Sequence, residues 1–534
     1  MYRSGAPALS ICLFCLAAGL AACRKDNPPP KWDVGITAPL VKTSLTIGDL
    51  VPDSMLSQDS EGRISILYST VLFSLSLDTV LNIPDTSFRY AYALPFPGPI
   101  DFQPGASFNA TDDVTRFDLQ DLQLSRLIVR SGQLDVAITN MMNGNIIGEF
   151  ALPGASLSGT PFAVQMQLPP GTPAAPSSTF ATRALDGYLF DLRGPAHNAV
   201  NALATHLSYA NSAAGPAVSI TDQDSLLAVV SYHGIVPQYA TGYFGMRHIT
   251  VAPATADLGL FSNISGTINL AQASAALRVR NGIGVDARAD IHYISAVNTR
   301  TGQSVDLAAN ITTAPLNINR AIDLGGHFQE ATTTFNLNGT NSNLLQFLNN
   351  LPDRLGYALD ITVNPLGNVG NGHDFLYHDS KLTAELDVDI PLRLIASDLA
   401  LRKVIDLDLP GTAQAHAWRS GTLHLFADNG FPFSASVQLA VADAGGQPLS
   451  PLTPGGTIAS GTLGTDGTVD TPVSSRLDFH LTAQQMDLLH QTGKLQVVAA
   501  FNTADQVQHV QILEQYRMDL QLTVQADYTV NGDE

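Results

Sequence analysis

Apolar and polar residues alternate strictly over two long stretches in the second half of the chain, residues 382–390 and 518–526. The apolar positions are Leu382, Ala384, Leu386, Val388 and Ile390 in the first stretch, and Met518, Leu520, Leu522, Val524 and Ala526 in the second. Thr, Glu, Asp and Gln fill the positions between them. A period of two gives a strand one buried face and one wet face, so both stretches predict strands of antiparallel sheets.

A Phe-x-Leu-x-small motif occurs three times, and its copies begin 145 and 144 residues apart at Phe190, Phe335 and Phe479. A strand that ends in an asparagine precedes the motifs by 50, 54 and 50 residues. The three asparagines are Asn140, Asn281 and Asn429. We expect them at tight turns or bulges, because asparagine tolerates the left-handed backbone conformation. The shared order and spacing predict three copies of one module, which we call the first, second and third copy.

A short amphipathic stretch follows each motif and predicts a helix. Pro195 suits the first turn in the first copy, and Thr482 with Gln485 fits a capping box in the third. The apolar positions of helical spacing are Val200, Leu203 and Leu207 in the first copy, Leu344, Leu345, Phe347 and Leu348 in the second, and Met486, Leu488 and Leu489 in the third.

The fold class we predict is mainly β, built of tandem antiparallel β-sandwich-like modules with one short helix each. The 43 glycines and 31 prolines suit the many turns of such a fold. The predicted division is an N-terminal β segment at 31–123 and modules at 124–252, 253–409 and 410–534. The alternative is one elongated, curved sheet with packed helices, similar in architecture to the tubular lipid-binding folds.

The first residues are typical of an export signal, with Arg3 before an apolar run at 8–20. This run is shorter than the roughly 20 residues that span a bilayer. It ends in Leu20-Ala21-Ala22-Cys23, which resembles the lipobox of bacterial lipoproteins. The resemblance implies that residues 1–22 are removed and that Cys23 carries a diacylglyceryl thioether and usually an amide-linked third chain. Each buried CH₂ contributes about 0.8 kcal/mol, so such chains form a lasting anchor. The alternative is an ordinary secretory signal with an incidental cysteine.

A short tether follows, because residues 23–30 include three consecutive prolines that favour extended polyproline II. In lipoprotein sorting, Asp directly after the acylated cysteine favours the inner membrane. Here that position is Arg24, which favours the outer membrane. We therefore expect an outer-membrane lipoprotein of the cell envelope, in either the periplasmic or the surface-exposed leaflet.

Composition narrows the chemistry. All three cysteines, Cys12, Cys15 and Cys23, lie in the signal or at its cleavage point, so we expect no disulfide and no cysteine-ligated metal in the processed chain. The chain has 27 basic against 47 acidic residues and no basic stretch, which argues against nucleic acid as a partner. A charged fraction of 14% with 45% hydrophobic residues is typical of a globular protein.

Three acidic or histidine-containing stretches are candidate sites. His373, Asp374, His378 and Asp379 could contribute to a zinc site, but a histidine spacing of five fits neither one helix face nor one strand face. Residues 466–470 resemble a calcium loop slightly, but lack its alternating acidic ligands. The carboxylates that could pair for glycoside hydrolysis are Asp112, Asp113, Asp118 and Asp121. The favoured interpretation of all three is solvated loops and turns, without a metal.

Motifs of catalysis are absent from the sequence: there is no Gly-x-Ser-x-Gly, no P-loop and no dinucleotide fingerprint. We therefore expect no enzyme, no catalytic residue and no cofactor. Two aromatic clusters are weak ligand-binding candidates, since exposed rings could stack on sugars or take an apolar ligand, although sheet core is favoured. They are Phe88, Tyr90, Tyr92 and Phe96, and Tyr232, Tyr239, Tyr243 and Phe244.

The function these patterns favour is that of a membrane-anchored, non-enzymatic lipoprotein, acting as a binding, adhesion or structural module. Its partners would be the membrane, through the anchor, and an envelope protein, glycan or lipid. The first alternative is a lipid or hydrophobic-ligand binder with an apolar groove lined by the inward residues of the alternating strands. The second is a glycan-active hydrolase with carboxylates about 5 to 9.5 Å apart. A continuous apolar cavity would favour the first alternative, and tightly filled cores would favour a scaffold.

Overall fold

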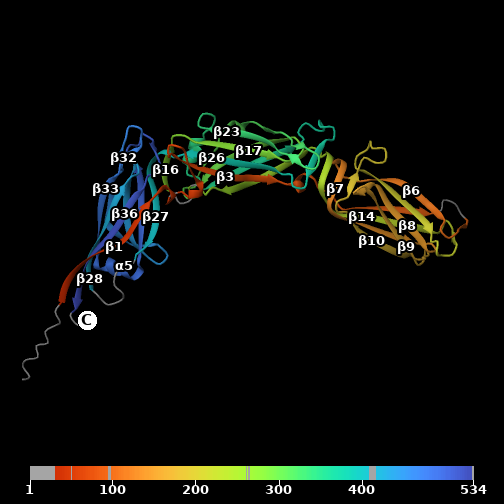
Figure 1. Cartoon of the computed structure of the whole chain (residues 1–534), viewed down its shortest axis with the longest axis horizontal. Helices are drawn as coiled ribbons and strands as arrows, with labels where there is room; N and C mark the ends of the chain where they lie inside the picture. The colour runs from red at the N-terminus through yellow and green to blue at the C-terminus, as the bar shows by residue number, and fades with distance from the viewer. Residues whose placement is uncertain are drawn as a thin grey trace, which may run out of the picture. The chain divides into compact units, whose positions relative to one another are not determined.

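The computed structural model describes residues 31–49, 51–93, 98–259, 261, 265–407 and 417–531. These residues form mainly antiparallel β-sheet with few helices (Figure 1), which confirms the predicted fold class. The strands are divided among several sheets and do not form one continuous elongated sheet. Two compact units are distinguished, and each is taken separately. Unit 1 comprises the described parts of Met1–Ser65, Phe261–Ala271 and Pro391–Glu534, and unit 2 those of Ile66–Leu260 and Gln272–Ile390.

The first copy lies in unit 2. Its strands are β7 (Gln123–Asn140), β8 (Ile146–Leu157), β9 (Thr160–Leu168), β10 (Ser177–Ala184), β11 (Leu189–Asp191), β12 (Ala202–Asn211) and β14 (Ser225–Tyr243). One sheet pairs β14 with β7, and β7 with β10 and β11. The other pairs β12 with β8, and β8 with β9. Because β11 also pairs with β8, the two sheets join along one edge.

The second copy, also in unit 2, repeats this order of pairing. Its elements are β17 (Ser274–Asn281), β18 (Ala287–Asn298), β19 (Gln303–Asp306), β20 (Leu316–Ile318), β23 (Ala331–Asn338), α4 (Leu344–Asn349), β24 (Arg354–Val363) and β26 (Leu382–Pro391). Here β17 pairs with β23 and β26, while β18 pairs with β19, β20 and β24.

The third copy forms most of unit 1 and has the same order again. Its elements are β28 (Ala417–Asn429), β29 (Phe433–Ala442), β30 (Pro448–Ile458), β33 (Val473–Thr482), α5 (Ala483–Thr492), β34 (Lys494–Thr503) and β36 (Met518–Asn531). Strand β28 pairs with β33 and β36, and β29 pairs with β30 and β34.

Two further strands complete each copy. They are β4 (Thr86–Ala93) and β6 (Ser107–Arg116) in the first, β3 (Ile64–Leu75) and β15 (Arg247–Asp257) in the second, and β1 (Lys31–Leu45) and β27 (Arg393–Asp406) in the third. Within the predicted N-terminal segment 31–123, the strands β1, β3 and β4 complete three different copies. Local pattern could not reveal this, since the sheet edge that accepts each strand lies more than a hundred residues away. The boundaries near 252 and 409 stay predictions.

The three landmark asparagines end the strands β7, β17 and β28, and all three are fully buried. In each, Oδ1 accepts the backbone N–H two residues on, at 2.9 Å. Nδ2 donates to the carbonyl four residues on and to a second carbonyl in a later loop, at 2.7 to 3.1 Å. Each asparagine lies at the short turn to the next strand, as expected, but none has a positive φ, so the left-handed conformation expected of them is wrong. A buried side-chain amide needs hydrogen-bond partners, and in each copy these three bonds join the turn after the strand to a later loop. We call this arrangement the asparagine lock.

In the part of the chain that the structure describes, α3 (Asn310–Thr313) and α4 lie in the second copy and α5 in the third, while α2 (Leu77–Val80) lies between β3 and β4. Helix α5 begins with the predicted capping box, in which Thr482 Oγ1 accepts from Gln485 N and Gln485 Oε1 accepts from Thr482 N. Helix α4 contains the predicted apolar stretch of the second copy. The helix expected after Pro195 is wrong, because residues 192–201 form turns with positive φ at Gly194, His197 and Asn201. Residues in an α-helix have negative φ, so three residues with positive φ exclude a helix over this stretch.

Candidate functional site

The stretch from Gly372 to Asp379 does not bring its histidines together. Its centre is β25 (Asp374–Tyr377), which pairs with the end of β14. His373 is exposed and its Nδ1 contacts the Gly370 carbonyl at 2.9 Å, whereas the backbone of His378 bonds to Gln238. Within the described ranges, no group of three or more His, Cys, Asp or Glu is arranged to hold a metal ion.

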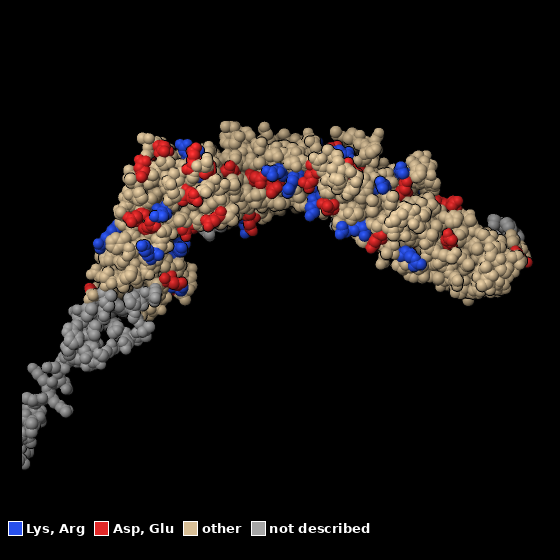
Figure 2. Space-filling model, in the orientation of Figure 1, with Lys and Arg blue, Asp and Glu red and all other residues tan. Residues whose placement is uncertain are grey.

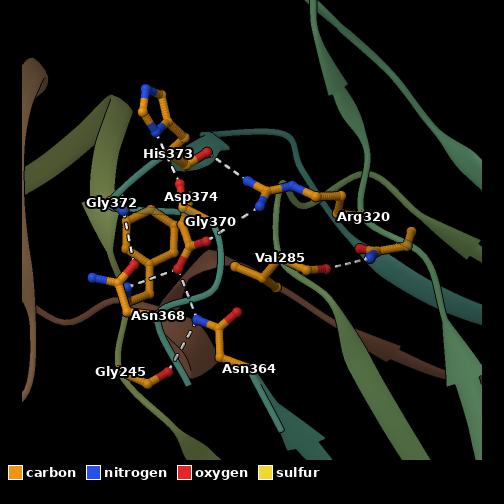
Figure 3. Close-up of polar contacts among 11 residues, drawn as sticks. Gly245, Val285, Arg320, Asn364, Asn368, Gly370, Gly372, His373 and Asp374 are labelled. Atoms are coloured by element: carbon orange, nitrogen blue, oxygen red, sulfur yellow. Dashed lines mark hydrogen bonds and ion pairs between the residues drawn. The ribbon is translucent and has the colours of Figure 1, made fainter. Parts of the chain in front are cut away.

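Asp374 is instead the centre of a buried clamp (Figure 3). Its Oδ2 accepts from the Phe244 N–H at 3.0 Å and from Asn364 Nδ2 at 2.7 Å. Arg320 Nη1 lies 3.6 Å from Oδ1, and Asn364 also donates to the Gly245 carbonyl at 3.2 Å. Burial raises the pKa of Asp374, while these donors oppose the rise. The carboxylate thus fixes the β14–β15 link to the loop before β25.

A second carboxylate, Asp323, lies beside the same strand. Its two oxygens accept from Tyr239 at 2.7 Å and Tyr377 at 2.8 Å, and Oδ1 also accepts the Gly325 N–H. Burial raises the pKa of Asp323, but these three hydrogen bonds outweigh burial and lower it overall. The ring centroids of Tyr239 and Tyr377 are 4.8 Å apart. The hydroxyl of Tyr239, a ligand-binding candidate, is therefore engaged within the fold.

The other aromatic candidates pack in or beside the core of the first copy. The Tyr90 hydroxyl contacts Thr115 Oγ1 at 2.5 Å, and that of Tyr92 donates to the Phe108 carbonyl at 3.2 Å. Both rings lie on one face of β4, as their spacing of two predicts. Tyr243 is half-buried, and Tyr232 and Phe244 are buried. Phe96 and the lipidation candidate Cys23 lie outside the described residues. The ligand-binding role of these tyrosines stays a prediction.

The four acidic candidates are all exposed. Asp112 contacts His206 Nδ1 at 2.7 Å, and Asp118 accepts from the Gln120 N–H at 3.2 Å. Of the four, only Asp118 lines the polar cavity of about 190 Å³ that Arg247 and Gln120 also line. A glycosidase needs two carboxylates at one cleft, and this cavity does not assemble the predicted pair.

Within the calcium-like stretch 466–470, residues 466–468 form a polar turn between β31 (Thr462–Leu463) and β32 (Val469–Thr471), and the last two residues begin β32. Asp466 Oδ1 accepts from both the N–H and the hydroxyl of Thr468, at 3.0 and 2.7 Å. Elsewhere on the surface, basic and acidic side chains are interspersed on the face drawn in Figure 2. Asp466 thus stabilises a turn, and Asp112 stabilises a cross-strand pair with His206.

An apolar cleft lies between the two sheets of the third copy, in unit 1. It encloses a cavity of about 70 Å³, and Thr43 is the one lining residue that is not apolar. Strands β1, β36 and β28 line one wall, and β27, β34, β29 and β30 the other. The inward row of β36 contributes Met518, Leu520 and Leu522, three positions of the alternating pattern seen in the sequence. The cleft reaches the partly exposed side chains of Val41, Leu45 and Ile405.

A lysine, Lys403, lies on the same face of β27 as the lining residue Ile405. Leu401, Lys403 and Ile405 alternate along β27, so they share one face of the strand. Their partners on β34 are Ala499, Val497 and Leu495, which all line the cavity. The Lys403 ammonium lies 3.9 Å from Asp49 Oδ1, and its side chain is 57% exposed. Sequence reasoning missed Lys403, although the alternation Leu-x-Lys-x-Ile could have drawn attention to it.

No protein-family model and no curated protein matches the chain. Among solved structures, a candidate secreted protein from Parabacteroides distasonis ATCC 8503 is similar at 13% identity and a TM-score of 0.29, over 52% of this chain and 82% of that one. Infectious bursal disease virus, Gt strain, follows at 11% identity and a TM-score of 0.12, over 91% and 85%. These scores are too low to support an argument. No helix of the described residues is long and apolar enough to cross a membrane.

Proposed function

We propose that the chain is a membrane-anchored, non-enzymatic lipoprotein whose β-sandwich copies form a binding or structural module of the cell envelope. Its partners would be the membrane, through the acylated Cys23, and an envelope protein, glycan or lipid. The observation that carries the proposal is the buried asparagine lock, which recurs with the same three hydrogen bonds in every copy. A polar network that is repeated only to hold loops supports an architectural purpose.

The polar residues elsewhere support the same proposal. Asp374 and Asp323 are both occupied by hydrogen bonds within the fold, which leaves neither placed as a general acid or base. The other polar residues that line the cavity beside Asp118 are Thr79, Asn82, Gln120 and Arg247, and none of them is a carboxylate. The four-residue lipobox resemblance supports the anchor.

Metabolic labelling tests the anchor. The full chain is expressed in a bacterium fed an alkyne-tagged fatty acid, and label and membrane sedimentation are measured. We expect both in the wild type, and loss of both in Cys23→Ala, because the thioether cannot form. Cys15→Ala is the matched control, since it changes a signal cysteine but keeps Leu20-Ala21-Ala22-Cys23. Unchanged label and sedimentation in Cys23→Ala would overturn the anchor.

Glycan turnover tests the non-enzymatic part. The purified chain is incubated with peptidoglycan and with oligosaccharides, and released reducing ends are measured. We expect none above the background of an Asp118→Asn variant. Turnover that Asp118→Asn abolishes would replace this proposal by the hydrolase alternative.

A further inference from the structure

We propose that the apolar cleft of the third copy binds a single-chain anionic amphiphile of the fatty-acid type, with its hydrocarbon chain between the two sheets and its carboxylate on Lys403. This rests on the proposed binding role and names a ligand class for it. The cleft itself does not depend on Cys23, so the two proposals fail separately.

The lining selects for hydrocarbon. Fifteen aliphatic, aromatic or thioether side chains and Thr43 surround the space, which offers a polar ligand almost no hydrogen-bond partner. A polar group placed there without partners would lose its hydration, whereas burial of each CH₂ contributes about 0.8 kcal/mol. Apolar cavities of this kind stay dry and accept apolar guests.

The dimensions select for a chain. A cavity of about 70 Å³ holds only part of a ligand, and a smaller space of about 10 Å³ adjoins it at Leu45, Phe501 and Met518, with Thr46 and Asp49 as its polar lining residues. The two spaces share these three residues, and the apolar part of the smaller lining is completed by Leu401, Phe431 and Phe433. A flexible chain can follow such a slot, and a rigid ring system cannot.

Lys403 supplies a cation at the opening, and Asp49 is the anion beside it. Lys403 stands between Leu401 and Ile405 in the inward row, and its aliphatic stem can line the opening while its ammonium reaches water. Its contact with Asp49 is long, at 3.9 Å, and both groups are partly exposed. Such an ion pair contributes about 0 to 1 kcal/mol, so a ligand carboxylate can displace it.

The competing explanation is that Lys403 only protects a sheet edge. β16 (Ser265–Leu270) pairs with β27 as far as Ala400, so Lys403 lies where no strand is paired on that side among the described residues. Inward-pointing charges on such edges hinder strand addition. That explanation predicts no ligand, whereas the adjoining apolar cavity is what the amphiphile accounts for.

Titration with laurate and with dodecanol tests the proposal. The protein is the full chain carrying Cys23→Ala, so that no covalent acyl group confounds the measurement, and calorimetry reports affinity and stoichiometry. We expect one laurate per chain. Lys403→Met should weaken laurate about two- to fivefold and leave dodecanol unchanged, because only the carboxylate needs the ammonium. Lys42→Met is the matched control, since Lys42 lies between Val41 and Thr43 on the opposite face of β1.

Variants that fill the space separate the cleft from other surfaces. Ala499→Leu should weaken laurate and dodecanol alike, and Val41→Phe at the partly exposed rim does the same if the first variant folds poorly. Absence of saturable binding, or binding unchanged by both filling variants, would overturn the cleft. Equal losses of laurate and dodecanol in Lys403→Met would overturn the assignment of the carboxylate.

Discussion

The first and third copies share one order of strand pairing and one asparagine lock, yet they fill the space between their sheets differently. Eight rings of the first copy pack in three groups, with centroids 5.2 to 6.4 Å apart within each group. The apolar cavity there is about 20 Å³, against about 70 Å³ in the third copy, whose cavity is lined almost wholly by aliphatic residues. Strand pairing and the asparagine lock thus determine the shared fold, whereas the size and shape of the core side chains determine whether space for a ligand remains between the sheets.

The largest effect we expect comes from the element that the two copies share. Asn140→Ala or Asn429→Ala leaves one N–H and two carbonyls buried without their partner. At about 1 to 3 kcal/mol for each such group, either change should cost about 3 kcal/mol or more. Hydrogen-exchange mass spectrometry of each unit, with the exposed Asn317→Ala as control, measures this. A cost confined to one copy would break the equivalence.

Substitutions that enlarge a core side chain should change the stability of the two copies in opposite directions. Ala155 is fully buried opposite Phe190, so Ala155→Leu overpacks the first copy and should cost about 1 to 3 kcal/mol. Ala499→Leu enters the cavity of the third copy and should stabilise unit 1 by about 0.5 to 1 kcal/mol. Denaturant unfolding followed separately in the two units gives both values. Destabilisation of unit 1 by Ala499→Leu would show that its cavity is not available space.

Helix α5 distinguishes the copies further. Thr482→Ala removes the hydroxyl that accepts from Gln485 N, which should cost about 1 kcal/mol. Thr482→Ser keeps the hydroxyl and serves as the control. The expected loss of amide protection lies in residues 483–492. Full protection in Thr482→Ala would mean that packing of Met486 and Leu489 alone maintains the helix.

The sequence predicted the repeating parts of the fold better than the parts that differ. Alternation located β26 and β36, and the spacing of Asn140, Asn281 and Asn429 marked the strand ends. Their role was missed, because a side chain that bonds to a loop some thirty residues away leaves no local pattern. The same limit hid where β1, β3 and β4 pair. For the candidate site, alternation identified the lining residues of β36, but the opposing wall with Lys403 depends on sheet-to-sheet packing.

The weakest effect we expect is a change in the pH dependence of stability, which is specific to unit 2. The pKa of Asp374 is raised in the fold, so its stabilising contribution is present below the ordinary value of 3.8 and is lost as pH rises above it. The pKa of Asp323 is lowered, so its contribution is present above 3.8 and is lost as pH falls. Asp374→Asn and Asp323→Asn should therefore change the slope of unit 2 stability against pH in opposite directions. Thermal unfolding of the two variants between pH 3 and 6 measures these slopes, and equal slopes would mean that burial does not distinguish the two carboxylates.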